Sequence, residues 1–225
     1  MEKLHLTSTS LLRYRLDQIM LFEEYHKQAA KDPSTKLVHK LRIINRHLGV
    51  VLNSRKLKKL VKVLGKERDL DVAIANAKTY CLGTKKLLKE KKKANKKTKR
   101  ELNLFDPTIL KRASTANLLM KYKSHMRHLN KELDHFETMT IADKQLHHLR
   151  IVLKQIRYGL EAIGERNIKL KHMQDSLGHI HDLEVLQKLT GKKRRIQKDK
   201  DLAIKKVKEN YPAIIKLVRK SLLRI

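Results

Sequence analysis

Two segments of the chain repeat histidine, arginine and lysine at the spacing of successive helical turns. They are VHKLRIINRHLGVVL, residues 38–52, and LHHLRIVLKQIRYGL, residues 146–160. At about 100° per residue, each segment aligns its basic side chains along one helix face: His39, Arg42 and Arg46 form the first basic row, and His147, Arg150, Lys154 and Arg157 form the second. Arginine binds phosphate through paired hydrogen bonds, lysine acts as a mobile point charge, and histidine titrates near neutrality. Each basic row is therefore a candidate phosphate-binding surface.

The basic rows carry no acidic residue, although like charges at these spacings weaken an isolated helix. Beside each row runs an apolar stripe that predicts a buried face: Leu41, Ile44, Leu48 and Leu52 in the first segment, and Leu149, Val152, Ile156 and Leu160 in the second. The alternative interpretation is a solvated basic face, or arginines paired with acids of a neighbouring helix. Recurrence in both segments favours phosphate binding.

A second pair of matching blocks follows the two segments. LGKERDLDV, residues 64–72, matches LGHIHDLEV, residues 177–185, and Lys58 matches Lys171 before them. Two ordered blocks at nearly the same offset indicate a duplicated helical unit, joined near residues 104–107. The aspartates of these blocks, Asp69 and Asp182, are interpreted as helix N-caps or as partners of core-facing arginines.

The composition points to a polyanionic partner. The chain has 54 Lys and Arg against 23 Asp and Glu, a formal net charge of +31. Such an excess repels itself and is favoured where a polyanion is present, such as nucleic acid, an anionic membrane surface or polymeric phosphate. The single cysteine, Cys81, excludes an intramolecular disulfide and is expected to be a small buried residue. With no signal-like or spanning apolar stretch, we expect a cytoplasmic protein without a membrane partner.

The spacing of apolar residues predicts an all-α fold, because strand-like alternation is scarce and only seven glycines and three prolines interrupt the chain. We expect a break in the last helix near Pro212. The predicted helices cover residues 9–31, 34–53, 55–65, 68–82, 84–104, 107–136, 142–164, 168–177, 180–190 and 193–224.

The four blocks in this order resemble the CHAD family, the α-helical domain named for its histidines, over residues 9–225. The resemblance implies two antiparallel four-helix bundles related by a pseudo-two-fold axis, here a single domain over 1–225 with halves at about 1–105 and 106–225. It also implies that both halves line a central basic cleft that binds inorganic polyphosphate without catalysis or cofactors, and that the protein associates with polyphosphate granules.

Carried over by position, the implied polyphosphate-binding residues are those of the two basic rows, with Lys58 and Lys171 as second-tier candidates. The chain departs from the family pattern at two positions. Gly49 stands where the family usually has arginine, opposite Arg157, and Gln155 stands where a basic residue is common. The first half is therefore expected to bind more weakly.

Other functions remain open from the residues alone. A nucleic-acid binder fits the charge, but aromatic residues make up only 4% of the chain, so few bases could stack, and weak non-specific binding is the expectation. A metal-dependent phosphohydrolase would need several carboxylates beside the basic rows, and no metal-ligand pattern accompanies the twelve histidines. The lysine-rich segment 85–100 is either a solvated, partly frayed helix or a polyanion-capturing arm. Segment 191–200 has the same two alternatives, but acids begin to interleave there with Asp199, which favours the solvated one.

Overall fold

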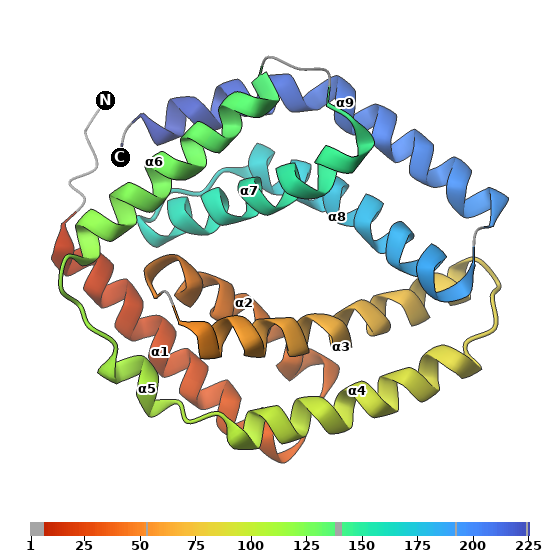
Figure 1. The fold of residues 1–225 in the computed structure, drawn as a ribbon, viewed down its shortest axis with the longest axis horizontal. Helices are drawn as coiled ribbons and strands as arrows, with labels where there is room; N and C mark the ends of the chain where they lie inside the picture. Colours follow the sequence, from red (N-terminus) through yellow and green to blue (C-terminus); the bar gives the residue numbers. More distant parts are fainter. Residues whose placement is uncertain (1–6, 53, 138–140, 192, 224) are drawn as a thin grey trace. The chain divides into compact units, whose positions relative to one another are not determined.

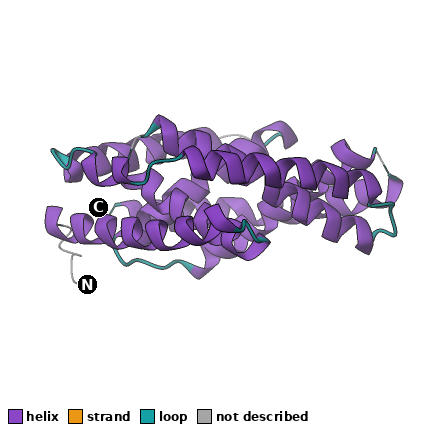
Figure 2. Ribbon diagram, turned by 90° about the horizontal axis from the view of Figure 1, so that it is seen from below, coloured by secondary structure: helices purple, strands orange, loops and turns teal. Residues whose placement is uncertain are grey.

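The computed structural model describes residues 7–52, 54–137, 141–191, 193–223 and 225, and no side chain of Glu137. Within these residues all regular structure is helical, as Figure 2 shows, and the predicted all-α class is confirmed. The helices are α1 Ser8–Lys31, α2 Thr35–Val51, α3 Arg55–Thr79, α4 Lys85–Leu104, α5 Thr108–Arg112, α6 Leu118–Glu137, α7 Asp143–Ala162, α8 Ile168–Thr190 and α9 Arg194–Leu222 (Figure 1).

The chain forms two compact units. Unit 1 comprises Met1–Leu12, Asn117–Glu184 and Lys192–Ile225, and unit 2 comprises Arg13–Ala116 and Val185–Gly191. Unit 2 therefore contains most of α1 and all of α2 to α5, whereas α6, α7 and α9 belong to unit 1. The arrangement of two four-helix bundles about a pseudo-two-fold axis stays a prediction.

Three predicted helix breaks are wrong. The glycines of the two LG blocks, Gly65 and Gly178, lie inside the continuous helices α3 and α8. A single glycine costs a helix only about 1 kcal/mol, which packing of the flanking leucines offsets. Pro212 likewise lies inside α9, so that helix continues past the predicted interruption.

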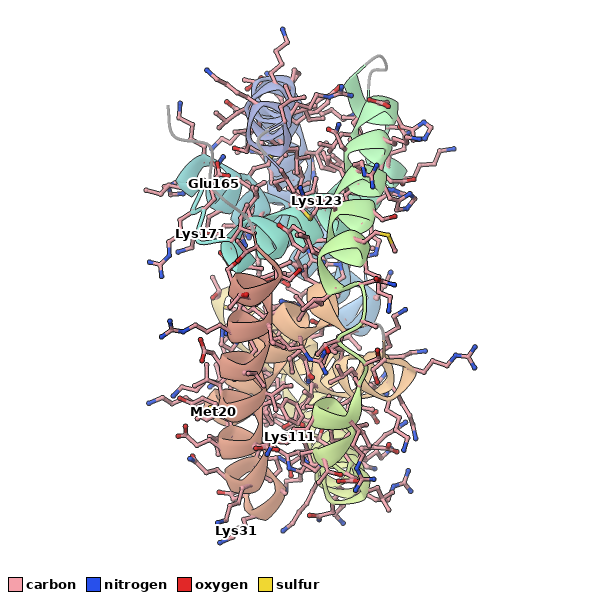
Figure 3. All side chains as sticks on the ribbon, turned by 90° about the vertical axis from the view of Figure 1, so that its left-hand side faces the viewer. Met20, Lys31, Lys111, Lys123, Glu165 and Lys171 are labelled. Atoms are coloured by element: carbon pink, nitrogen blue, oxygen red, sulfur yellow. The ribbon has the colours of Figure 1, made fainter. Side chains whose placement is uncertain are left out.

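The opposite error occurs after α4, where one long helix was predicted over 107–136. The structure has the short α5 and then α6, separated by residues 113–117. Arg15 of α1 donates to the carbonyl of Leu110 at 3.0 Å and to that of Ser114 at 3.3 Å. A buried guanidinium thus satisfies carbonyl groups that a continuous helix would have bonded internally. Nearby, Lys111 of α5 pairs with Glu23 of α1 at 2.8 Å; Figure 3 labels Lys111.

Within unit 2, α3 packs between α2 and α4 through leucines that alternate at helical spacing. Leu57, Leu60 and Leu64 of α3 are at most 3% exposed. The Ser54 hydroxyl caps α3 by accepting a hydrogen bond from the backbone N–H of Leu57 at 3.3 Å. This cap fixes where α3 begins and, with it, the positions of the block that follows.

Within unit 1, α6 crosses α7 at a glycine. A Cβ atom at Gly159 would overlap the end of the Met126 side chain on α6, so any larger residue there would force that thioether to move. Beside this contact the Tyr122 hydroxyl donates to the carbonyl oxygen of Gly159 at 2.8 Å. Burial raises the pKa of Tyr122, which keeps its hydroxyl protonated as the donor.

Cys81 is exposed, so the expectation of a small buried residue is wrong. It follows the C-terminal end of α3 with a φ of 54°, a left-handed conformation that reverses the chain toward α4. No helix within the described residues combines the length and apolar character needed to cross a bilayer.

Candidate functional site

The first basic row lies on α2 of unit 2. Its apolar neighbour Leu41 is fully buried, which orients the helix and leaves the row at the edge of the packed face. His39 is exposed, Arg46 is half-buried, and Arg42 is only 8% exposed. The row therefore combines one exposed, one half-buried and one buried side chain, and the Arg42 guanidinium lies in a low-dielectric environment.

The second basic row lies on α7 of unit 1 and has the same pattern of exposure. His147 is exposed, Lys154 is half-buried, and Arg150 is 9% exposed. Arg157 extends the row by a further turn and pairs with Glu161 at 3.3 Å. Equivalent positions of the two basic rows thus have equivalent exposure.

Arg68 of α3 joins the first basic row. Although His39 is exposed overall, partial removal of its ring from water is the largest cause that lowers its pKa, and the positive charges of Arg42, Arg68 and Arg46 lower it further. Because Arg68 comes from the next helix, the electropositive site of unit 2 is built by α2 and α3 together. The lowered pKa indicates that His39 is neutral at neutral pH until an anion approaches.

His181 of α8 has the corresponding place in unit 1. Its ring centroid lies 5.6 Å from that of His147 on α7, with the ring planes 43° apart. His181 and Arg68 are equivalent residues of the two LG blocks. The sequence interpretation missed both, although each immediately precedes the aspartate that it singled out.

The N-cap interpretation of Asp69 and Asp182 is wrong, because both lie well inside α3 and α8. Asp69 instead lies 3.4 Å from the guanidinium of Arg68. The residues that cap these helices are Ser54 and Asn167, which accept from the N–H groups of Leu57 and Leu170. The two caps are equivalent positions of the repeat, so both units begin this helix at the same point.

The remaining candidates are accessible. Lys58 and Lys171 are both exposed in the first turns of α3 and α8, and Figure 3 labels Lys171. Gly49 is exposed on α2, and a Cβ built there would meet nothing within 4 Å. The departure of Gly49 from the family pattern therefore reflects no steric requirement. Gln155, the other departure, is half-buried.

Among the described residues no group of three or more histidines, cysteines or carboxylates is arranged to hold a metal ion. The nearest cluster joins His148 to Glu132 at 2.8 Å, with His128 4.0 Å from the same carboxylate. This cluster is centred on a hydrogen bond between α6 and α7, outside the second basic row.

Comparison with known proteins places the chain in a family. A family model described as CHAD domain matches residues 51–190, more than half of the chain, and the chain belongs to this family. A solved structure, the CHAD domain from the plant Ricinus communis, is similar with a TM-score of 0.57 at 19% identity. The alignment covers 97% of this chain and 92% of that one. No curated protein matches the sequence.

The two comparisons cover the basic rows differently. The family match includes the second basic row, Arg68 and His181, but begins after the first basic row. The structural alignment covers nearly the whole chain and so extends the shared fold to both repeats. At 19% sequence identity, the similarity to that structure supports a shared fold alone.

Proposed function

We propose that the protein binds inorganic polyphosphate through its two basic rows, assisted by Arg68 and His181, and that it performs no chemical step on the chain. The observation that carries the proposal is the duplicated row of His, Arg and Lys with one deeply held arginine in each copy. Membership of the CHAD family, which is associated with polyphosphate binding in general, supports the same ligand. Association with polyphosphate granules would follow from such binding.

The burial of Arg42 and Arg150 suits a ligand made of closely spaced charges. A guanidinium that is largely removed from water attracts a phosphate more strongly than a fully hydrated one, because the effective dielectric constant is lower. It also offers two parallel N–H donors to one phosphate group. The outer members of each row, Arg46 and Lys154 among them, would hold neighbouring phosphates of the same chain.

His39 adds a pH-dependent contribution. Its pKa is lowered by burial and by the surrounding arginines, so it is neutral in the free protein at neutral pH. A bound polyanion reverses the sign of the local potential and favours the imidazolium form. Binding should therefore take up a proton at His39 and strengthen as the pH falls.

Bare phosphate fits the rows better than nucleic acid does. Tyr158 is an aromatic residue adjoining the second basic row, and it is only 4% exposed. The guanidinium carbon of Arg157 lies over the Tyr158 ring, 4.6 Å from the ring centroid. A ring covered in this way offers no face for a base to stack on. Sequence-tolerant nucleic-acid grooves depend on such faces.

The test is a titration of the purified protein with long-chain polyphosphate over a series of salt concentrations, with DNA of equal phosphate content as competitor. We expect tight binding that weakens steeply with salt, by analogy with counterion release from nucleic acids, and that DNA does not displace. Equal displacement by DNA would mean that net charge alone drives binding. Shortening of the chain in the presence of divalent metal would contradict a role without chemistry.

A further inference from the structure

The outer face of α4 carries a second line of positive charge that the proposed function does not use. We call this line, all of whose members are exposed, the α4 lysine row; it consists of Lys85, Lys89, Lys92, Lys96 and Lys99. The spacing alternates four and three residues, so the row is straight and runs about 21 Å along the helix at 1.5 Å per residue. Two further exposed lysines, Lys86 and Lys97, lie about a third of a turn away.

The α4 lysine row lies opposite the face by which α4 packs. Leu87 and Ala94 are buried, and at about 100° per residue they fall roughly half a turn from the row. Figure 1 shows α4 running beside α3 at the edge of unit 2. Segment 85–100 is therefore a packed helix throughout, and the frayed alternative is wrong.

No ion pair reaches the α4 lysine row among the described residues. The two acids of α4 lie off the row and have other partners: Glu90 pairs with Lys93 at 3.1 Å, and Glu101 pairs with Lys59 at 2.9 Å. A solvated helix face would ordinarily intersperse acids to relieve repulsion. The five aligned lysines therefore repel one another without a carboxylate paired to them in the described part of the chain, whereas Lys93 beside them pairs with Glu90.

The α4 lysine row and the first basic row belong to different surfaces of unit 2. Glu67 and Asp71 of α3 face α4, where they contact Asn95 and Lys91. Arg68 lies about 100° further around α3, and its charge lowers the pKa of His39 in the first basic row. Because α4 directs its lysines away from α3, a phosphate chain lying along the first basic row does not also cover them.

We propose that the α4 lysine row binds a second polyphosphate chain, so that one protein molecule bridges two chains. This inference rests on the proposed function. A line one residue wide, with charges about 5 Å apart on average, suits a single flexible strand of phosphates rather than a duplex. No aromatic residue lies within α4 to stack on a base. Lysine, a mobile point charge, needs no fixed orientation of the phosphate groups.

The chain supplies a matched control on α9. Lys198, Lys205, Lys206, Lys216 and Lys220 are also exposed, but Asp201 and Glu209 lie among them on the helix surface. Changing these five lysines to glutamine removes the same net charge as changing the five of the α4 lysine row. The two variants therefore remove equal charge, and only the α4 variant removes an acid-free line.

The experiment measures bridging directly. Polyphosphate is fixed to beads, the protein is bound and washed, and a labelled polyphosphate chain is added; the label retained reports a second chain on the same protein. We expect wild type and the α9 variant to retain label, and the α4 variant to bind the beads but retain little. Circular dichroism checks that both variants keep their helix content.

Each other outcome has one meaning. If the α4 variant retains as much label as wild type, or wild type binds the beads and retains none, the second site is wrong while the proposed function stands. If wild type does not bind the beads, the proposed function fails and the bridging inference falls with it. DNA as the labelled chain, retained as well as polyphosphate, would contradict the assignment of the ligand.

Discussion

The imidazole rings of His147 and His181 lie 5.6 Å apart, centroid to centroid, on the consecutive helices α7 and α8. The equivalent residues of unit 2 are His39 and Arg68, and the charge of Arg68 lowers the pKa of His39. The two matching segments therefore both have histidine at the first position of this pair, whereas the second position is Arg68 in unit 2 and His181 in unit 1. Each site is defined by two helices of the unit rather than by one helical segment.

Reversing charge at one half-buried residue in each basic row should strongly weaken polyphosphate binding while the fold survives. The double variant Arg46→Glu with Lys154→Glu is preferred, because both side chains are half-buried, whereas a carboxylate replacing Arg42 or Arg150 would be buried. We expect at least a roughly tenfold loss of affinity through lost phosphate contacts. Lys216→Glu with Lys220→Glu is the control, and equal losses in both variants would refute the assignment.

Removing Arg68 should raise the pKa of His39 toward the ordinary value and weaken polyphosphate binding. The reason is that the guanidinium repels the imidazolium form and also offers a phosphate contact. Proton NMR titration of Arg68→Ala measures the pKa, with the His39 resonance assigned by comparison with His39→Gln. Lys66→Ala, an exposed lysine two residues earlier, serves as control. An unchanged His39 titration in Arg68→Ala would show that the two residues do not form one site.

Restoring arginine at position 49 should strengthen the first half of the site. A Cβ atom built there meets nothing within 4 Å, so the first atom of a new side chain is accommodated, and because Gly49 is exposed the rest can extend into solvent. Replacing a helical glycine should also stabilise the fold by about 0.5–1 kcal/mol. Gly49→Gln separates the effects, because it gives the helix gain without the charge. We expect only the arginine variant to bind polyphosphate more tightly, with the slope of log affinity against log salt steeper by about one unit. Identical polyphosphate binding by the two variants would contradict the assignment of position 49 to the binding site.

The buried carboxyl group of Glu67 should make stability depend on pH. Burial is the largest cause raising its pKa, while the Thr98 hydroxyl and the Asn95 amide favour the charged form. Folding therefore favours the protonated carboxyl, and its contribution is full below the ordinary pKa of 4.5 and declines as the pH rises through the raised pKa. We expect Glu67→Gln to gain Tm relative to wild type as the pH increases.

Thermal unfolding over a pH series measures this difference. Glu90→Gln is the control, since Glu90 is an exposed carboxyl whose pKa is lowered, first of all by its hydrogen bond with Lys93. Its contribution to stability is lost as the pH falls, so the control should change with pH in the opposite direction. Curves of Tm against pH that run parallel for wild type and Glu67→Gln would show that the carboxyl does not titrate as expected.

Local spacing was enough to predict which residues form the basic rows and most helices, because helical periodicity is written in neighbouring residues. It failed at Gly65 and Gly178, where tertiary packing carries a helix through a weak helix former. It failed again at residues 113–117, where Arg15, almost a hundred positions earlier in the chain, bonds the carbonyls at the end of α5. Signals from distant residues are absent from any local pattern.

The sequence by itself determined the helical class, the two pairs of matching blocks, and the two acid-free basic rows, since each depends only on residue type and spacing. Only the tertiary structure decided that Arg42 and Arg150 are buried to the same degree, that Arg68 and His181 join the rows, and that Asp69 is no cap. It also showed that α4 directs five lysines away from its packed face. The physical reason is that burial and electrostatic neighbourhood come from helices brought together by folding.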